Sequence, residues 1–225
     1  MIDLFFIILG AVAAYLIGSF PTAVWYSKRY FGIDVRDYGS GNAGATNTFR
    51  VLGSRAGMVV LLIDVLKGFV ATSLAWVLTY THLVSYDEFM LEKLLFYKLI
   101  FGLLAVLGHI FPIYANFKGG KGVATLLGMM LCVNWAVTLI CLGIFIIVLL
   151  LSQYVSLGSL LAALAFPLIL LSPRFKPDDP VLTVFGFFMF IVIAITHKKN
   201  IIRLANGEES RTKISFKRQM KLYQD

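Results

Sequence analysis

Apolar residues occur along the chain in long runs that short polar segments separate. The runs cover residues 2–25, 56–80, 94–114, 123–171 and 181–196. Most of them hold about 20 residues or more, which is the length of an α-helix that spans a bilayer. The pattern therefore predicts an all-α integral membrane protein.

The run at residues 123–171 is long enough for two or three helices. Two dipeptides, Asn134-Trp135 and Gln153-Tyr154, interrupt its apolar character. Breaks at these points give helices near residues 122–133, 136–152 and 155–171. Together with the four other runs, the prediction is seven transmembrane helices.

The Lys and Arg residues indicate how these helices are oriented. Five lie at residues 26–55, two at 115–123 and eight from residue 196 onward, whereas the other connections hold three. The positive-inside rule then puts these three basic segments, including the C-terminus, in the cytoplasm and the N-terminus outside. This orientation requires an odd number of crossings, which the division of 123–171 into three helices provides.

The overall composition agrees with a membrane protein. Hydrophobic residues make up 59% of the chain and charged residues 14%, whereas about 25% of residues are charged in soluble domains. The first run lacks a basic n-region and exceeds signal-peptide length, so we interpret it as a retained helix. The net charge of +8 suits anionic lipid or an anionic substrate better than nucleic acid. Cys132 and Cys141 show no paired spacing and most simply pack.

The first polar segment with candidate chemistry is residues 39–50, GSGNAGATNTFR. Its start fits the dinucleotide-binding pattern G-x-G-x-x-G, and Asp64 follows Gly44 at about the spacing of a ribose-binding acid. That pattern has meaning only between a strand and a helix, and a loop between two membrane spans leaves no room for the sheet. A dinucleotide site is therefore excluded.

The same segment is well suited to bind another anion. Gly39, Gly41 and Gly44 permit close backbone approach and positive φ, so that successive N–H groups can turn toward a ligand. Neutral hydrogen-bonding groups and one guanidinium accompany them: Ser40, Asn42, Thr46, Asn47 and Arg50. The alternative is a flexible polar loop whose arginine serves only the membrane topology.

A second cluster consists of residues 108–112, GHIFP, and residues 117–125, FKGGKGVAT. A glycine loop with Lys118, Gly119, Gly120 and Lys121 precedes a helix that should begin near Gly122, and such a helix N-terminus favours anions. The spacing does not match a Walker motif. Topology anchoring remains the alternative for the lysines, and a structural role is favoured for His109.

A third cluster follows the last span, with His197, Asn200 and Arg203 ahead of Glu209. If the last helix continues, these three side chains share one face and can meet one ligand. The alternative is a basic amphipathic tail on anionic lipid, which we prefer for the cations after residue 212. Within a span, Asp64 and Lys67 are most simply interpreted as a pair that neutralises itself.

Taken together, the three segments resemble the PlsY-type acyl-phosphate:glycerol-3-phosphate acyltransferases. The likeness extends from about residue 18 to Glu209 and includes Asp64-x-x-Lys67-Gly68 and the segment 154–157, YVSL. It divides the chain into a polytopic membrane acyltransferase domain, residues 1–209, and a basic cytoplasmic tail, residues 210–225. Two departures, the acidic stretch at 86–92 and the long tail, touch none of the three segments.

The resemblance implies transfer of a fatty acyl group from acyl phosphate to the 1-hydroxyl of glycerol 3-phosphate, which yields lysophosphatidic acid and phosphate. It implies a multi-pass protein of the bacterial inner membrane with its active site on the cytoplasmic face. Its partners would be the two substrates and membrane lipid, with no nucleic acid, metal or cofactor. The implied catalytic residues are Ser40, Arg50, Lys121, His197 and Asn200. The implied substrate-binding residues are Asn42, Thr46, Asn47, Lys118, Gly119, Gly120, Arg203 and Glu209.

Cations and hydrogen-bond donors suit this reaction, because phosphate is already a good leaving group on an acyl phosphate. We therefore favour direct attack over a Ser40–His197 nucleophilic pair, for which no orienting acid is evident. A transporter of phosphorylated metabolites and a lipid-binding scaffold are the rival interpretations. All three segments fall on one side of the membrane, which disfavours transport.

Overall fold

The computed structural model describes residues 2–80 and 89–212, and within these ranges the only regular elements are helices. The acidic stretch at 86–92 lies partly outside these ranges, and the tail beyond Thr212 lies wholly outside them. The chain divides into two compact units at the junction of Val133 and Asn134.

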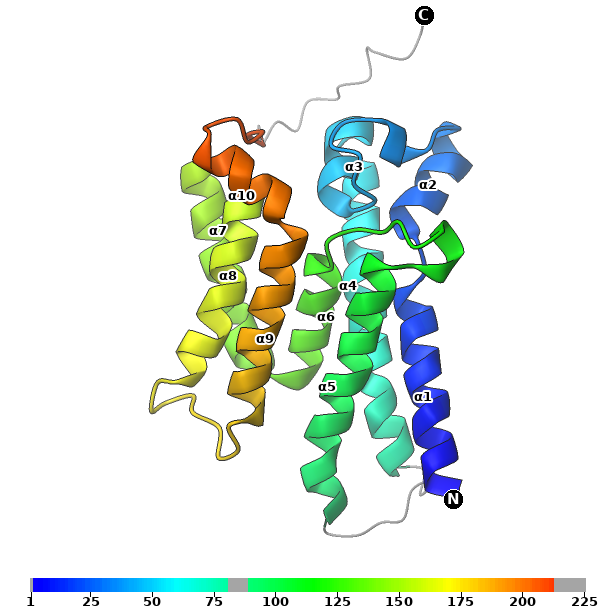
Figure 1. Cartoon of the computed structure of the whole chain (residues 1–225), viewed down its shortest axis with the longest axis vertical. Helices are drawn as coiled ribbons and strands as arrows, with labels where there is room; N and C mark the ends of the chain where they lie inside the picture. The colour runs from blue at the N-terminus through cyan, green and yellow to red at the C-terminus, as the bar shows by residue number, and fades with distance from the viewer. Residues whose placement is uncertain (1, 81–88, 213–225) are drawn as a thin grey trace, which may run out of the picture. The chain divides into compact units, whose positions relative to one another are not determined.

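Unit 1 holds the first eight helical elements (Figure 1). They are α1 Ile2–Gly18, α2 Thr22–Phe31, the 3₁₀ turn η1 Val35–Asp37, α3 Ala45–Leu52, α4 Ser54–Tyr80, α5 Phe89–Ile110, the 3₁₀ turn η2 Ile113–Ala115 and α6 Val123–Val133. The helices α2 and α3 and the connection between α5 and α6 lie at the same end of this unit. The first and second polar segments of the sequence are thus brought to one end.

Small residues allow the long helices of unit 1 to pack closely. The core between α1, α4 and α5 includes Ala14, Ala71, Ala75 and Ala105, all fully buried. A side chain at Gly128 of α6 would overlap the backbone of α4 at Val65. Because lipid provides no hydrophobic drive between helices, such backbone contacts supply much of the packing energy.

Unit 2 contains α7 Trp135–Ser152, α8 Val155–Leu170, α9 Val181–Thr196 and α10 Lys198–Ala205. The sequence-predicted breaks at Asn134 and Gln153 are confirmed. The Asn134 side chain accepts a hydrogen bond from the N–H of Val137 and so caps α7, and Gln153 adopts a left-handed conformation with φ 63°. Within this unit, α10 and the α7–α8 connection lie at one end, and the 171–180 connection lies at the other (Figure 1).

Two of the expected helices are bent. The run at residues 2–25 forms α1 and α2, which meet at an angle of 41°. Pro21 has no N–H and disfavours helical geometry in the residue before it, so it breaks the run. Likewise the last helix does not continue past Thr196, because the chain turns by 69° at His197 before α10 begins.

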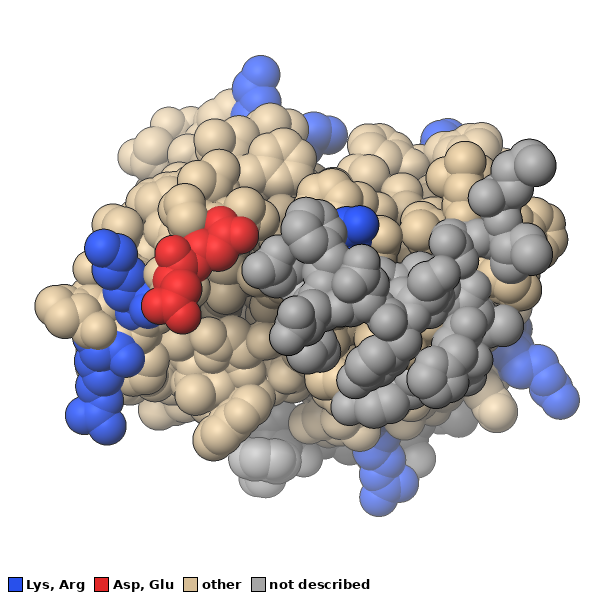
Figure 2. Space-filling view, turned by 90° about the horizontal axis from the view of Figure 1, so that it is seen from below, with Lys and Arg blue, Asp and Glu red and all other residues tan. Residues whose placement is uncertain are grey.

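Among the residues that the structure describes, three helical stretches are long and apolar enough to cross a bilayer: residues 54–79, 93–115 and 135–152. The two bent pairs qualify if each counts as one span, and α6 and α8 are shorter apolar helices. With 11 residues, α6 is about 17 Å long. In the view of Figure 2, most of the described atoms of each unit belong to residues other than Lys, Arg, Asp and Glu.

Candidate functional site

The glycine-rich loop of unit 1 is built around the side chain of Asn47, on the first turn of α3. Its Oδ1 accepts hydrogen bonds from the backbone N–H (2.9 Å) and the hydroxyl (3.1 Å) of Ser40. Its Nδ2 donates to the carbonyls of Val35 (2.9 Å) and Tyr38 (3.0 Å). Asn47 is 1% exposed, so its amide fixes the loop from inside.

Glycine is required in this loop by both geometry and space. Gly39 and Gly41 have backbone φ angles of 62° and 71°, values that residues other than glycine rarely adopt. A Cβ at Gly39 would also overlap the Oδ1 of Asn47. Ser40, Thr46 and Arg50 remain exposed, and Asn42 is half-buried. The loop thus has a rigid interior and presents hydroxyl and guanidinium groups at its surface.

The second loop folds back onto the end of α5. The N–H of Gly119 donates to the carbonyl of Ile110 (3.2 Å), and that of Gly120 donates to the carbonyl of His109 (3.1 Å). A Cβ at Gly120 would overlap the Nε2 of His109, so a side chain there would displace the loop. Lys121 follows directly and is partly exposed immediately before α6.

A buried polar cluster joins this loop to the helices beneath it. The Oδ1 of Asp64 accepts from the hydroxyl of Thr22 (2.9 Å) and contacts the Nζ of Lys67 (2.9 Å). Lys67 also donates to the carbonyl of Phe20 at the bend between α1 and α2 (2.9 Å). The Nδ1 of His109 lies 3.6 Å from the same Asp64 oxygen. The predicted pairing of Asp64 and Lys67 is confirmed, and the imidazole of His109 lies next to this pair without a described hydrogen bond from its Nδ1.

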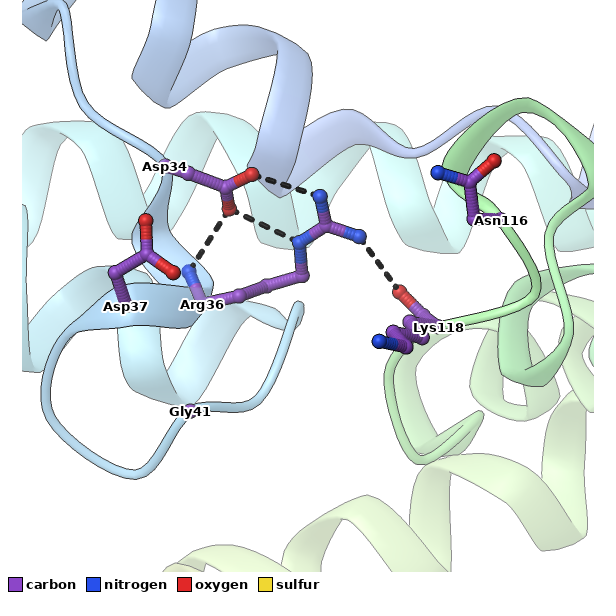
Figure 3. Close-up of a pocket in the computed structure, with 7 residues that line it drawn as sticks. Asp34, Arg36, Asp37, Gly41, Asn116 and Lys118 are labelled. Atoms are coloured by element: carbon purple, nitrogen blue, oxygen red, sulfur yellow. Dashed lines mark hydrogen bonds and ion pairs between the residues drawn. The ribbon is translucent and has the colours of Figure 1, made fainter.

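A pocket of about 490 Å³ lies where the two loops of unit 1 meet (Figure 3). Its lining residues are Asp34, Arg36, Asp37, Gly41, Asn116, Lys118 and Gly119. Of these, the sequence analysis assigned functional roles only to the glycines and Lys118. The Asp-Val-Arg sequence just ahead of the glycine-rich segment was the signal for Asp34 and Arg36, and it was not used.

Arg36 connects the two loops across this pocket. Its Nε and Nη2 donate to the two carboxylate oxygens of Asp34 (3.0 and 2.7 Å), and its Nη1 donates to the carbonyls of Ala115 (3.2 Å) and Lys118 (3.5 Å). The hydrogen bond from Arg36 holds the pKa of Asp34 well below its usual range and outweighs the opposing effect of burial. Asp34 is therefore ionised at neutral pH.

In unit 2, the carboxylate of Glu209 gathers three hydrogen-bond donors. Its Oε1 accepts from the hydroxyl of Ser156 (2.9 Å) and from the Nδ2 of Asn200 (2.6 Å), and its Oε2 accepts from the Nε of Arg203 (2.8 Å). Burial raises the pKa of Glu209, but the hydrogen bonds from Asn200, Ser156 and Arg203 outweigh it, so the net shift is downward. The ionised carboxylate thus ties α10 to the start of α8.

His197 occupies the bend between α9 and α10 and is 2% exposed. Its Nδ1 lies 2.8 Å from the carbonyl of Ile193. Because a carbonyl only accepts, this contact favours the tautomer that carries its proton on Nδ1. Asn200 and Arg203, on α10, meet at Glu209, so the structure brings together three of the four residues predicted from the third segment.

Within residues 2–80 and 89–212, no group of three or more His, Cys, Asp and Glu side chains is arranged to hold a metal ion. Apart from His197 and Glu209, the polar side chains that the resemblance assigns to the site are hydroxyls, amides, lysines and arginines. Chemically, such sets bind and orient anions and stabilise developing negative charge.

Comparisons with known proteins agree with this chemistry. A family model described as glycerol-3-phosphate acyltransferase matches residues 8–207. A glycerol-3-phosphate acyltransferase of Chlorobium phaeobacteroides (strain BS1) is 41% identical over an alignment of 232 positions, which covers 93% of this chain and 98% of that protein. This agreement confirms the resemblance seen in the sequence.

The fold is also similar to two crystal structures of PlsY (YgiH), an integral membrane glycerol 3-phosphate acyltransferase. The glycerol 3-phosphate form gives a TM-score of 0.76 at 32% identity, covering 92% of this chain and 96% of that one. The lysophosphatidic acid form gives 0.75 at 33% identity, covering 92% and 95%.

Proposed function

Because the chain belongs to the glycerol-3-phosphate acyltransferase family, we propose that it acylates the 1-hydroxyl of glycerol 3-phosphate with acyl phosphate as the donor. The hydroxyl oxygen attacks the acyl carbon and forms the ester bond, and the bond from the acyl carbon to the phosphate oxygen breaks. The hydroxyl proton is released, and the products are lysophosphatidic acid and inorganic phosphate.

One observation carries this proposal most directly. Two loops rich in glycine, hydroxyl and cationic groups lie against each other at one end of unit 1, around a pocket of about 490 Å³. Both substrates are phosphorylated, and a rigid backbone with nearby cations suits phosphate. The Asp34 carboxylate at the pocket is already paired with Arg36 and Lys28. The solved relatives in glycerol 3-phosphate and lysophosphatidic acid forms support the same acceptor and product.

We assign the predicted residues the following roles. Ser40, Arg50, Lys121, His197 and Asn200 hold and polarise the reacting groups. Asn42, Thr46, Lys118, Gly119, Gly120 and Arg203 bind the substrates. Asn47 and Glu209, which the sequence analysis assigned to substrate binding, each have their hydrogen-bonding groups occupied by protein partners. Both are therefore proposed to position other residues. For Glu209 there is a second reason, because its carboxylate would repel phosphate.

The transfer is proposed to be direct, without an acyl-enzyme. The hydroxyl of Ser40 donates to the amide oxygen of Asn47 (3.1 Å), and an amide oxygen is too weak a base to activate a serine. Phosphate leaves readily from an acyl phosphate, so the protein needs only to orient the two anions and stabilise the carbonyl oxyanion. A substrate phosphate is proposed to accept the hydroxyl proton.

In this proposal seven helical segments cross the bacterial inner membrane, with the N-terminus outside and the loops of both units facing the cytoplasm. The apolar segments that support this count are the three long helices, the two bent pairs, and α6 and α8. The distribution of Lys and Arg supports the orientation. The water-soluble acceptor would then reach the site from the cytoplasm, and the acyl chain would approach from the bilayer.

The test is an assay of the purified full-length protein in phospholipid nanodiscs. Palmitoyl phosphate and glycerol 3-phosphate should yield lysophosphatidic acid and phosphate in equal amounts, whereas palmitoyl-CoA should not replace the acyl phosphate. Lack of any product in folded protein would refute the proposed activity.

A second incubation tests the direct transfer. Palmitoyl phosphate alone should give no burst of phosphate and no palmitoyl mass on the peptide that contains Ser40. An adduct at Ser40 that forms as fast as turnover would refute direct transfer while leaving the acyltransferase activity in place.

A further inference from the structure

Arg36 of η1 is the side chain that links the two loops of the pocket, and nothing in the proposed reaction yet uses it. Its side chain is 22% exposed, and that of Asp34 is 14% exposed. The guanidinium contacts Asp34 with two nitrogens and reaches the second loop with the third (Figure 3). Asp34 thus fixes the orientation in which the guanidinium meets the second loop.

The backbone that carries Arg36 is itself fixed. Val35 is fully buried; its N–H donates to the hydroxyl of Ser27 on α2 (3.2 Å), and its carbonyl accepts from Asn47 on α3 (2.9 Å). The backbone N–H of Arg36 also donates to the Oδ1 of Asp34 (3.0 Å). The same Asn47 amide holds Ser40, so Arg36 and Ser40 share one rigid support.

The segment that Arg36 holds is conformationally unusual. Its two acceptors, the carbonyls of Ala115 and Lys118, flank Asn116 and Phe117, which have φ of 54° and 57°. Positive φ is uncommon for residues other than glycine and persists where surrounding contacts enforce it. One guanidinium therefore binds the carbonyls on both sides of the strained pair, and the second of these, at Lys118, lies three residues before Lys121.

We propose that Arg36, oriented by Asp34, is a positioning residue that clamps the second loop against the glycine-rich loop and so sets where Lys118 and Lys121 lie relative to Ser40. The inference rests on the proposed acyl transfer, since it assigns these three residues to substrate. A lysine could not replace the clamp, because its single ammonium cannot grip a carboxylate with two parallel bonds and still reach two carbonyls.

The test compares Arg36→Ala and Arg36→Lys with Arg29→Ala in the full-length protein in nanodiscs. Arg29 is an exposed cation on α2 for which the structure describes only a contact with the ring of Tyr30. Its replacement by alanine changes the net charge by the same amount as Arg36→Ala, seven residues earlier in the chain. It controls for charge near the site without touching the clamp.

Steady-state kinetics give the first readout. Loss of charge-assisted hydrogen bonds that set the phosphate site should raise the KM for glycerol 3-phosphate about tenfold or more in Arg36→Ala. The kcat should fall by a smaller factor than the KM rises, because weaker phosphate binding affects the ground state and the transition state together, whereas displacement of Lys121 from the reacting groups affects only the transition state. Arg36→Lys should lie in between, and Arg29→Ala should match the wild type.

Hydrogen exchange of the backbone amides at 117–120 gives a second readout, which needs no activity. These N–H groups donate within the loop, to Pro112, Ala115, Ile110 and His109. They should exchange faster in both Arg36 variants and at the wild-type rate in Arg29→Ala. If wild-type protein lacked acyltransferase activity, this measurement would still show whether Arg36 holds the second loop in place.

Wild-type KM and wild-type exchange in Arg36→Ala would overturn the proposal. So would a lower kcat at unchanged KM with a lower unfolding midpoint, which indicates a general loss of structure. If Arg36→Ala fails to fold, the same two measurements on Arg36→Lys decide.

Discussion

Replacement of Glu209 by glutamine tests how unit 2 holds its polar residues. The Glu209 side chain is 6% exposed and accepts from Ser156, Asn200 and Arg203. A glutamine of the same shape keeps one acceptor oxygen and turns the other into an NH₂ donor. Because all three partners are donors, Glu209→Gln sets a donor against either Arg203 or the Asn200–Ser156 pair.

The cost follows from the bonds that remain. A hydrogen bond to a charged group contributes about 1.5–3 kcal/mol. The amide oxygen can still accept from Asn200 and Ser156, although without the charge. Arg203 is 37% exposed, so solvent reduces the value of its ion pair. Together these terms predict that the free energy of unfolding falls by about 2–3 kcal/mol.

The effect has a defined pH dependence. The folded-state pKa of Glu209 lies below its ordinary value of 4.5, so the carboxylate binds its proton more weakly in the folded state than in the unfolded one. Its contribution to stability is therefore complete above pH 4.5 and is lost as the pH falls through the folded-state value. The difference between wild type and Glu209→Gln should be constant near neutral pH and shrink in acid.

The assay is thermal and denaturant unfolding of both proteins in the same detergent, with Glu208→Gln as the matched control. Glu208 is exposed, and its side chain makes none of the hydrogen bonds that the structure describes at Glu209. The control should unfold like the wild type. Equal unfolding of Glu209→Gln and Glu208→Gln at neutral pH would refute the reasoning.

Three further predictions concern other parts of the chain. Gly128→Leu forces a side chain into the backbone of Val65 and should strongly lower the unfolding midpoint in detergent. Gly143→Leu places its side chain in open space and should leave the midpoint unchanged. Equal midpoints of the two variants would contradict the close packing of α4 and α6. Lys121→Ala should lower kcat/KM about tenfold or more in folded protein. Lys176 is an exposed lysine, and Lys176→Ala should leave kcat/KM unchanged. Unchanged turnover in Lys121→Ala would indicate that Lys121 serves only the membrane topology. Deletion of residues 213–225 should leave kcat and KM intact, and loss of activity in inserted protein would assign the tail a catalytic role.

The sequence predicted most helix boundaries, because they depend on local chemistry. The breaks at Asn134 and Gln153 follow from a side-chain cap and a left-handed residue, both of which act within a few residues. The bend after α1 was missed although Pro21 was visible, because the apolar run continued past it. The helix α3 was missed because the glycines ahead of it obscured its start at Ala45.

The sequence predicted candidate site residues only where the chemistry of a side chain by itself suggests phosphate binding. Exposed Ser40 and Arg50 have side chains whose chemistry alone suggests phosphate. Asn47 looks the same in the sequence, yet its amide is fully occupied by Ser40, Val35 and Tyr38. Arg36 contacts carbonyls 79 and 82 residues away, and no local pattern encodes such a contact. Roles that depend on which groups meet across the fold required the structure.

The two units use the same physical device. In each, one buried side chain has its hydrogen-bonding groups occupied: Asn47 beneath the glycine-rich loop and Glu209 beneath α10. The proposed direct transfer from acyl phosphate would form no covalent enzyme intermediate to hold the substrate in place, so its rate would depend on how well the binding groups are preorganised. Side chains on loops are mobile unless such supports fix them. The protein's activity would therefore depend strongly on residues that position the substrate-binding groups. Substitutions at Asn47 or Glu209 should reduce activity because they change the geometry of the neighbouring side chains.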